Sequence, residues 1–331
     1  MVFNLVVIVL LFLFYSAYCV VKKNEKMALL LALIFIFLSV LLRINVRSEL
    51  NKDYDNYLSL LSNDFTLFDS GVFKIFSEPY YYASVQFFNW IAGGTDKMQL
   101  EKVYQLNFVF STLFYLWLAR ISDIHIWKKI FLFSFTYFLF TYTAIRNSVA
   151  YYLVTILFYE VQREGVFRWA FLAFLAHISA LPVLLISFFK NRKPSFWVIF
   201  SLVTIAVLGY TVGQSIESFS FIFQKLDEYS EYSLQQNSIH KIYFYLLLAV
   251  TLFLLIIDSS AVFNNIYIGL FVVYVILFMM NPVLGFRFSF YLILYLIVYP
   301  GYKNSIFNKV AQLAIPLFVG LLLFSFLDMS L

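Results

Sequence analysis

The sequence predicts an all-α polytopic membrane protein with about 10 to 11 transmembrane helices, of which one is broken or re-entrant, and two long extracytoplasmic loops. Of its 331 residues, 63% are hydrophobic and only 12% are charged, with a mean hydropathy of +0.86. Apolar runs recur at about the 20 residues that a helix needs to cross a bilayer. No soluble domain has this balance. We therefore expect one integral membrane domain over residues 1–331.

The first third of the chain predicts three spans and one long loop. Residues 3–21 and 27–42 are apolar and joined by a short lysine-rich link, which the positive-inside rule assigns to the cytoplasm. Residues 3–21 lack the basic start and the small-residue cleavage site of a signal peptide. Residues 44–102 are too polar to span and form the first extracytoplasmic loop, in which 79–91 could lie as an interfacial amphipathic helix. The chain then returns through 103–119.

Two apolar runs in the middle of the chain are interrupted. Residues 130–159 are too long for one span and suit two short ones, with a tight turn near 141–147 that places Arg146 at the outer membrane boundary. Residues 167–189 would, as one span, leave the following cations outside. We therefore expect a helix broken near His177, and such breaks occur where protein or water lines them.

The last third predicts a second long loop and a second tight turn. Residues 213–241 form the second extracytoplasmic loop. Asn281 and Pro282 separate two apolar runs, and Arg287 follows about one helical turn later. The remaining predicted spans are 196–212, 242–257, 262–280, 283–299 and 306–327.

The cysteine and histidine content argues against several chemistries. Cys19 is the only cysteine, so the chain contains no disulfide. His125, His177 and His240 lack metal-ligand spacing. We also find no phosphate-binding glycine loop and no nucleic-acid module, and the net charge of +5 is spread over short loops, where it sets topology. We expect neither a metal nor a cofactor, and no nucleic-acid partner.

Arg146, Arg287 and His177 are the candidate catalytic residues. A guanidinium is permanently charged and binds phosphate oxygens in a bidentate manner, so two at one membrane face could hold a pyrophosphate. The alternative is that both arginines reach toward lipid headgroups. His177 could serve as a base, as a phosphate partner or as a packing residue.

Acidic and aromatic residues of the first loop are the candidate substrate-binding residues. Asp53, Asp55 and Tyr57 open the loop, and Glu78 and Tyr81 lie in its second half. A carboxylate can take a proton from an attacking hydroxyl, and a tyrosine ring can stack on a sugar. The alternative is a solvated acidic loop without a specific role.

Five short motifs occur together in a fixed order. They are Asp-Tyr-Asp-Asn-Tyr from Asp53, Glu-Pro-Tyr-Tyr from Glu78, Ile-Arg-Asn-Ser-Val-Ala from Ile145, Ala-His-Ile-Ser-Ala-Leu from Ala176 and Gly-Phe-Arg-Phe-Ser-Phe-Tyr from Gly285. This series resembles the EpsG family of Wzy-type polysaccharide polymerases. The chain departs from the family pattern at Tyr80, where a small residue is usual, and at Phe286, where a glutamate is usual.

The resemblance implies a polymerase that joins undecaprenyl-pyrophosphate-linked oligosaccharide repeat units into a surface polysaccharide, such as O-antigen, capsule or exopolysaccharide. It would act at the outer face of the bacterial cytoplasmic membrane, among membrane lipids, without a metal or a nucleotide. Its partners would include a flippase and a chain-length regulator protein.

Two other functions remain open at this stage. A GT-C-like glycosyltransferase that uses a polyprenyl-phosphate sugar would also place acidic residues in its first outer loop, and it would require a divalent metal. A lipid-linked glycan flippase or transporter would tend to carry charges at the bilayer midplane in repeated halves.

Overall fold

The computed structural model describes residues 2–21, 24–46, 48–51, 54–55, 57–58, 79–188 and 241–300. Every regular element in these residues is a helix, which confirms the all-α class. The helices are α1 (Val2–Val20), α2 (Glu25–Asn45), η1 (Ser48–Leu50), α5 (Pro79–Ala92), α6 (Asp96–Arg120), α7 (Ile126–Phe138), η2 (Leu139–Thr143), α8 (Ile145–Gln162), α9 (Phe171–Ala176), η3 (Ile178–Ala180), α10 (Leu181–Phe188), the helix Lys241–Ile257, α13 (Ser259–Val262), α14 (Asn265–Met280) and α15 (Pro282–Val298).

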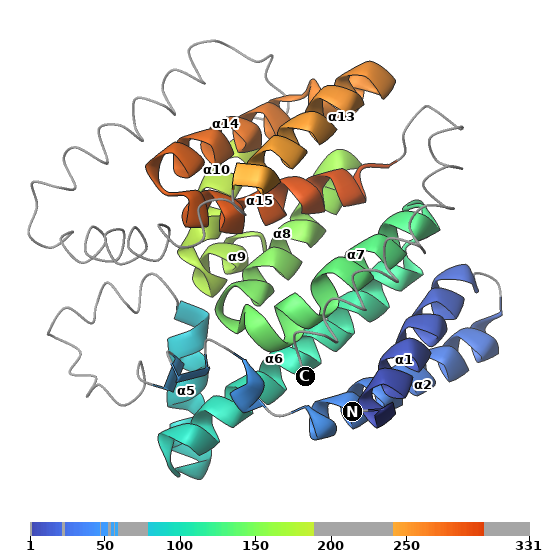
Figure 1. Cartoon of the computed structure of the whole chain (residues 1–331), viewed down its shortest axis with the longest axis vertical. Helices are drawn as coiled ribbons and strands as arrows, with labels where there is room; N and C mark the ends of the chain where they lie inside the picture. The colour runs from blue at the N-terminus through green and yellow to red at the C-terminus, as the bar shows by residue number, and fades with distance from the viewer. Residues whose placement is uncertain are drawn as a thin grey trace, which may run out of the picture.

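Helices α1 and α2 form a hairpin at one edge of the bundle (Figure 1). Their inner face packs on α6 and α7 through aromatic rings, and Tyr15 stacks on Phe133 at 4.0 Å between ring centroids. Their outer face exposes large apolar side chains, including Phe37, which is 64% exposed. A soluble protein would cover such a face, whereas lipid can solvate it.

Helix α8 runs parallel to α15 at the centre of the bundle. The Tyr151 hydroxyl donates a hydrogen bond to the Arg287 carbonyl, Gln162 Nε2 donates to the Tyr295 carbonyl, and Arg163 donates to the Val298 carbonyl. The paired residues are 136, 133 and 135 positions apart. This nearly constant offset means that both helices begin at the same end of the bundle, which we call the arginine end.

Two buried lysines mark the opposite end, which we call the lysine end. Lys128 Nζ donates to the carbonyls of Leu296 and Tyr299 at 3.3 and 2.7 Å, and Lys129 Nζ donates to the carbonyls of Ala119 and Ile121. The last carbonyls of a helix have no intrahelical donor and carry partial negative charge. The start of α7 therefore caps the ends of α15 and α6.

The predicted turn between the two halves of residues 130–159 is confirmed. Helix α7 passes into η2, a π-helical turn in which the Ala144 amide donates to the Leu139 carbonyl at 2.7 Å, and α8 begins at Ile145. Asn107 of α6 donates from Nδ2 to the carbonyls of Phe140 and Thr141, and these two hydrogen bonds hold the turn against α6. The turn returns the chain to the bundle with Arg146 in the first helical turn.

The predicted break at His177 is also confirmed. His177 is extended, with φ −162° and ψ 137°, between α9 and η3. Ser179 then contacts Tyr291 in the middle of α15, and Ile186 lies against Gly269 near the start of α14, which begins at the lysine end. From Ser179 to Ile186 the chain makes no progress toward the arginine end, in contrast to a single straight span.

The structure describes two helices that begin within the predicted first loop. Helix α6 contains the predicted span 103–119 and begins seven residues before it, at Asp96, because Asp96 is a favourable first-turn residue and the polar residues after it are good helix formers. Helix α5 forms where the sequence predicted a helix over 79–91. It packs antiparallel along α6, with Gln99 bonded to Asn89 at one end and Tyr80 against Phe110 at the other. Part of residues 44–102 therefore belongs to the bundle.

Helices α1, α2, α6 and α15 are at least as long as the expected spans, whereas the apolar runs 130–159 and 167–189 are divided into shorter helices. One described helix, α2, is both long and apolar enough to cross a membrane by itself, and five shorter apolar helices accompany it. The breaks at η2 and His177 account for some of the short pieces. The predicted spans 196–212 and 306–327 and almost all of the loop 213–241 lie outside the described residues.

Candidate active site

Arg146 lies at the arginine end and contacts a residue of the first loop. Its guanidinium carbon lies 5.0 Å from the centroid of the Tyr57 ring, within cation–π range. The Tyr57 hydroxyl donates to the Thr143 carbonyl at 2.9 Å, and the Tyr81 hydroxyl donates to the Tyr57 carbonyl at 3.1 Å. Three of the predicted site residues, Arg146, Tyr57 and Tyr81, are therefore brought together.

The two tyrosines support the arginine in this structure. Tyr57 is 3% exposed and Tyr81 is 0% exposed, so neither presents an open ring face to a sugar. Their rings lie 6.1 Å apart, and each is anchored by its hydroxyl to a backbone carbonyl. They fix the start of α8 against the first loop and α5.

Arg287 lies on the helix next to Arg146. It follows the N-terminus of α15, where Asn281 accepts hydrogen bonds from the amides of Val283 and Leu284 and Pro282 occupies the first turn. Its own carbonyl binds Tyr151 of α8. Because α8 and α15 begin at the same end, their positive helix termini and the two arginines concentrate positive charge there. Such an arrangement favours an anionic ligand.

His177 is linked to the helix of Arg287 by hydrogen bonds. Its Nδ1 accepts from the Ser179 amide at 3.1 Å and lies 2.8 Å from Ser179 Oγ, which in turn lies 2.8 Å from the Tyr291 hydroxyl. Tyr291 follows Arg287 by one helical turn, on the same face of α15. The structure therefore connects His177 to the region of Arg287 through two side chains.

The bond from the Ser179 amide fixes the tautomer of His177. A backbone amide can only donate, so Nδ1 must be an acceptor, and the proton of the neutral ring lies on Nε2. Nε2 of the neutral His177 ring is thus a hydrogen-bond donor. This geometry suits contact with an anionic oxygen better than removal of a proton from a hydroxyl.

The acidic candidates are distributed differently. Asp55 is exposed at the arginine end, two residues before Tyr57 in the sequence. Asp53 and Glu78 lie outside the described residues. Among the residues that the structure describes, no three His, Cys, Asp or Glu side chains lie close enough to hold a metal ion.

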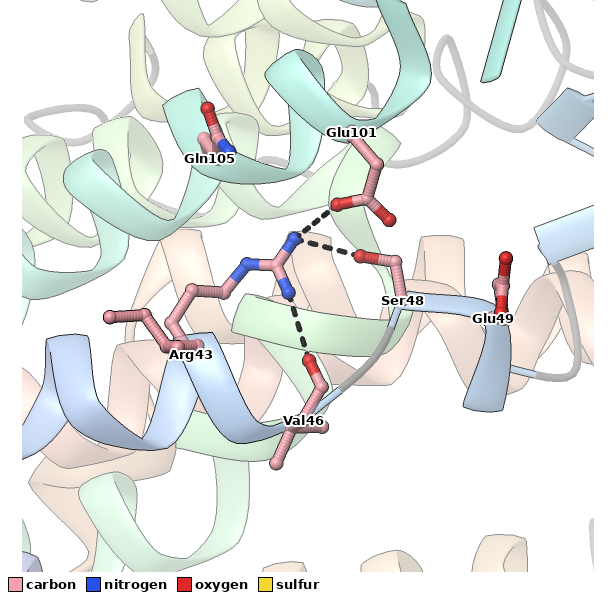
Figure 2. A pocket seen from close by; sticks show the side chains of 7 residues that line it. Arg43, Val46, Ser48, Glu49, Glu101 and Gln105 are labelled. Atoms are coloured by element: carbon pink, nitrogen blue, oxygen red, sulfur yellow. Dashed lines mark hydrogen bonds and ion pairs between the residues drawn. The ribbon is translucent and has the colours of Figure 1, made fainter. Parts of the chain in front are cut away.

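A cavity near the same end contains residues that the sequence did not identify as a site. It has a volume of about 500 Å³ and lies where α2, η1 and the first half of α6 meet (Figure 2). Arg43 forms an ion pair with Glu101 at 2.7 Å and donates to Ser48 Oγ at 2.7 Å and to the Val46 carbonyl at 3.0 Å. An arginine near the end of an apolar helix was the available signal, but its partner is 58 residues away.

Buried polar residues of α6 also escaped prediction. Asn107 is fully buried, and its Oδ1 accepts a hydrogen bond from Ser148, two residues after Arg146. A second pair, Ser111 and the Tyr152 hydroxyl, lies 2.6 Å apart. In the sequence, Asn107 and Ser111 were visible only as polar residues inside the apolar run 103–119. They join α6 to the first turns of α8 and so help to place Arg146.

Comparison with known proteins identifies the family. The model of the EpsG family matches residues 28–331, which is nearly the whole chain. No curated protein and no solved structure matches the sequence. The matched region contains every residue of the site described above, from Arg43 to Tyr291. The chain therefore belongs to the EpsG family, a membrane-protein family of Wzy-type polysaccharide polymerases.

Proposed function

We propose that this protein joins undecaprenyl-pyrophosphate-linked oligosaccharide repeat units into a surface polysaccharide at the outer face of the bacterial cytoplasmic membrane. The observation that carries the proposal is the placement of Arg146 and Arg287 on adjacent parallel helices that begin at one end of the bundle. Two guanidinium groups at neighbouring helix N-termini form a suitable site for a pyrophosphate.

The chemistry requires one bond to break and one to form. The bond between the anomeric carbon of the growing glycan and its pyrophosphate oxygen breaks, and the lipid pyrophosphate leaves with the electron pair. A hydroxyl oxygen of the incoming unit forms the new bond to the same carbon and loses its proton to a base. Arg146 and Arg287 stabilise the charge that grows on the leaving group.

His177 and the acidic residues divide the remaining roles. The Ser179 amide donates to Nδ1 of His177, so the neutral ring carries its proton on Nε2, and this nitrogen would donate to a pyrophosphate oxygen when the substrate binds. The base is then a carboxylate, and Asp53, Asp55 and Glu78 are the candidates. This mechanism needs neither a metal nor a nucleotide, so a chelator should leave the rate unchanged, whereas a GT-C-like transferase would lose activity.

Charge distribution supports an outward-facing arginine end. The first loop leaves and re-enters the bundle there, because Arg43 near the end of α2 binds Glu101 in the second turn of α6. The helix Lys241–Ile257 also begins there, with Tyr243 against Phe286 of α15. The lysine end carries the short basic connections expected in the cytoplasm. A flippase would supply lipid-linked units to the outer face, and a chain-length regulator would act on the growing polymer.

The test uses purified protein in lipid nanodiscs with lipid-linked repeat units from the source strain, and polymer is followed as a ladder on a gel. Arg146→Ala and Arg287→Ala should each lower the rate by about two to three orders of magnitude, as expected for loss of one charge-stabilising group. Arg168→Ala is the matched control, because this arginine is exposed near the lysine end. A wild-type protein that forms no ladder, or arginine variants at wild-type rate, would contradict the proposal.

A further inference from the structure

The cavity beside Arg43 is separate from the arginine pair but lies close to it. Arg43 lies 5.8 Å from the Tyr104 ring, Tyr104 lies 6.4 Å from the Tyr57 ring, and Tyr57 lies 5.0 Å from Arg146. The separation of the two guanidinium groups cannot exceed these three contacts placed end to end. An oligosaccharide of a few rings can bridge such a distance.

The charges of the cavity are balanced within it. The Arg43 guanidinium is paired with Glu101, and the lining residue Glu49 forms an ion pair with Lys97. Among the described residues, these two cations and two carboxylates leave no net charge, so an anion entering here would meet two carboxylates and two cations that are already paired. Charge balance therefore argues against a phosphate or a pyrophosphate as the ligand.

The remaining polar groups suit hydroxyls. Glu101 is 34% exposed through its side chain, Glu49 is 44% exposed, and Gln105 is exposed beside them, so carboxylate oxygens and an amide border one open space (Figure 2). Carboxylates accept hydrogen bonds from hydroxyls, and an amide both donates and accepts. Ile44, which is 74% exposed, adds an apolar edge against which the C–H face of a sugar ring can pack.

The cavity is also preorganised and of adequate size. Three hydrogen bonds hold the Arg43 guanidinium, and the buried Tyr104 ring lies beside it. A volume of about 500 Å³ falls within the range of small-molecule sites. Rigid polar groups around a cavity reduce the entropy that a ligand must lose on binding.

On these grounds we propose that the cavity beside Arg43 binds a neutral, hydroxyl-rich sugar of the incoming repeat unit and holds it next to the Arg146 site. The assignment of this sugar to the incoming unit rests on the proposed polymerase function. The binding of a neutral oligosaccharide to the cavity can be tested without that function.

The probe is the lipid-free repeat-unit oligosaccharide released by mild acid from the lipid-linked units of the source strain. Its binding to the full-length protein in nanodiscs is measured by calorimetry for the wild type, Gln105→Ala, Gln105→Trp and the control Gln86→Ala. Gln86 is an exposed glutamine of α5, away from the cavity. Melting temperatures show whether each variant is folded.

We expect Gln105→Ala to weaken binding about fivefold to tenfold, the loss of one or two hydrogen bonds, and Gln105→Trp to abolish it by filling the cavity. Gln86→Ala should bind as the wild type does. Excess inorganic pyrophosphate should not displace the oligosaccharide. The proposal would be overturned if both Gln105 variants bound the oligosaccharide as tightly as the wild type does. Displacement of the oligosaccharide by pyrophosphate, or its failure to bind the wild type, would also overturn it. A wild type that binds the oligosaccharide but forms no ladder would instead contradict the polymerase function alone.

Discussion

Gly285→Ala tests whether the close approach of α14 and α15 positions Arg287. A Cβ atom at Gly285 would lie 2.7 Å from both Cα and Cβ of Phe278 and 3.0 Å from its backbone nitrogen. Non-bonded carbon atoms require roughly 3.5–4.0 Å, so the start of α15 must move away from α14 by about 1 Å. The obstruction is backbone, which cannot rotate out of the way as a side chain can.

The expected effects on stability and on activity differ in size. Overpacking lowers the free energy of unfolding by about 1–3 kcal/mol, but the higher helix propensity of alanine restores up to about 1 kcal/mol. The protein should therefore remain folded, with a slightly lower melting temperature. Activity should fall much further, because Arg287 lies two residues beyond Gly285 and moves with the helix. A misplacement of about 1 Å at a catalytic group costs about 100-fold in rate.

The matched control for this variant is Gly269→Ala. A Cβ atom there would meet only the side chain of Ile186, at 2.9 Å from Cγ2, and that side chain can change rotamer. Both variants are assayed for the polymer ladder and for thermal unfolding in nanodiscs. Polymer formation by Gly285→Ala at the wild-type rate, or an equal loss of activity in Gly269→Ala, would refute a role of this close approach in positioning Arg287.

Three further predictions concern single contacts. Tyr57→Phe should retain most of the polymerisation rate, whereas Tyr57→Leu should lower that rate about fivefold to tenfold, because only leucine removes the aromatic ring that contacts Arg146. Equal rates of the two variants would argue against a cation–π role. His177→Gln, which keeps a donor near the position of Nε2, should be clearly more active than His177→Ala in the same gel assay, and two equally inactive variants would instead indicate a base. Burial raises the pKa of Asp123, but the hydrogen bonds and the positive charge of Arg163 outweigh burial and lower that pKa below its ordinary value. The ion pair of Asp123 and Arg163 therefore stabilises the fold at neutral pH. This stabilisation is lost as the pH falls through the lowered pKa of Asp123. The melting temperature should therefore fall less on acidification in Asp123→Asn than in the wild type, and parallel curves would show that the pair has no such role.

The interruptions of the fold were predictable from sequence because each carries a local signal. Asn281 and Pro282 begin α15 as the sequence indicated, since proline is preorganised for a first helical turn. His177 ends α9 in a run where cations would otherwise lie on the wrong side. The π-helical form of the turn before Arg146 was not predictable, because its pattern depends on Asn107 of another helix.

The site was only partly predictable because its contacts join distant segments. Arg146 and Arg287 were selected for their place after tight turns, but the parallel pairing of their helices follows from packing and not from spacing. Tyr57 was selected as a substrate-binding residue, and its contact with Arg146 could not be predicted because the two lie 89 positions apart in the sequence. Arg43 and Glu101 each read as ordinary interfacial charges, and only the fold brings them together.

The lysine caps have a consequence for the order in which the protein can be assembled. The acceptors of Lys129 lie 8 and 10 residues before it, so its amine is satisfied as soon as α6 and α7 meet. The acceptors of Lys128 lie 168 and 171 residues after it, at the end of α15. Throughout synthesis of the intervening chain, Lys128 must keep its ammonium in water at the membrane surface. Helix α7 can therefore reach its final depth only when α15 has been made, and the middle and last thirds of the protein mature together.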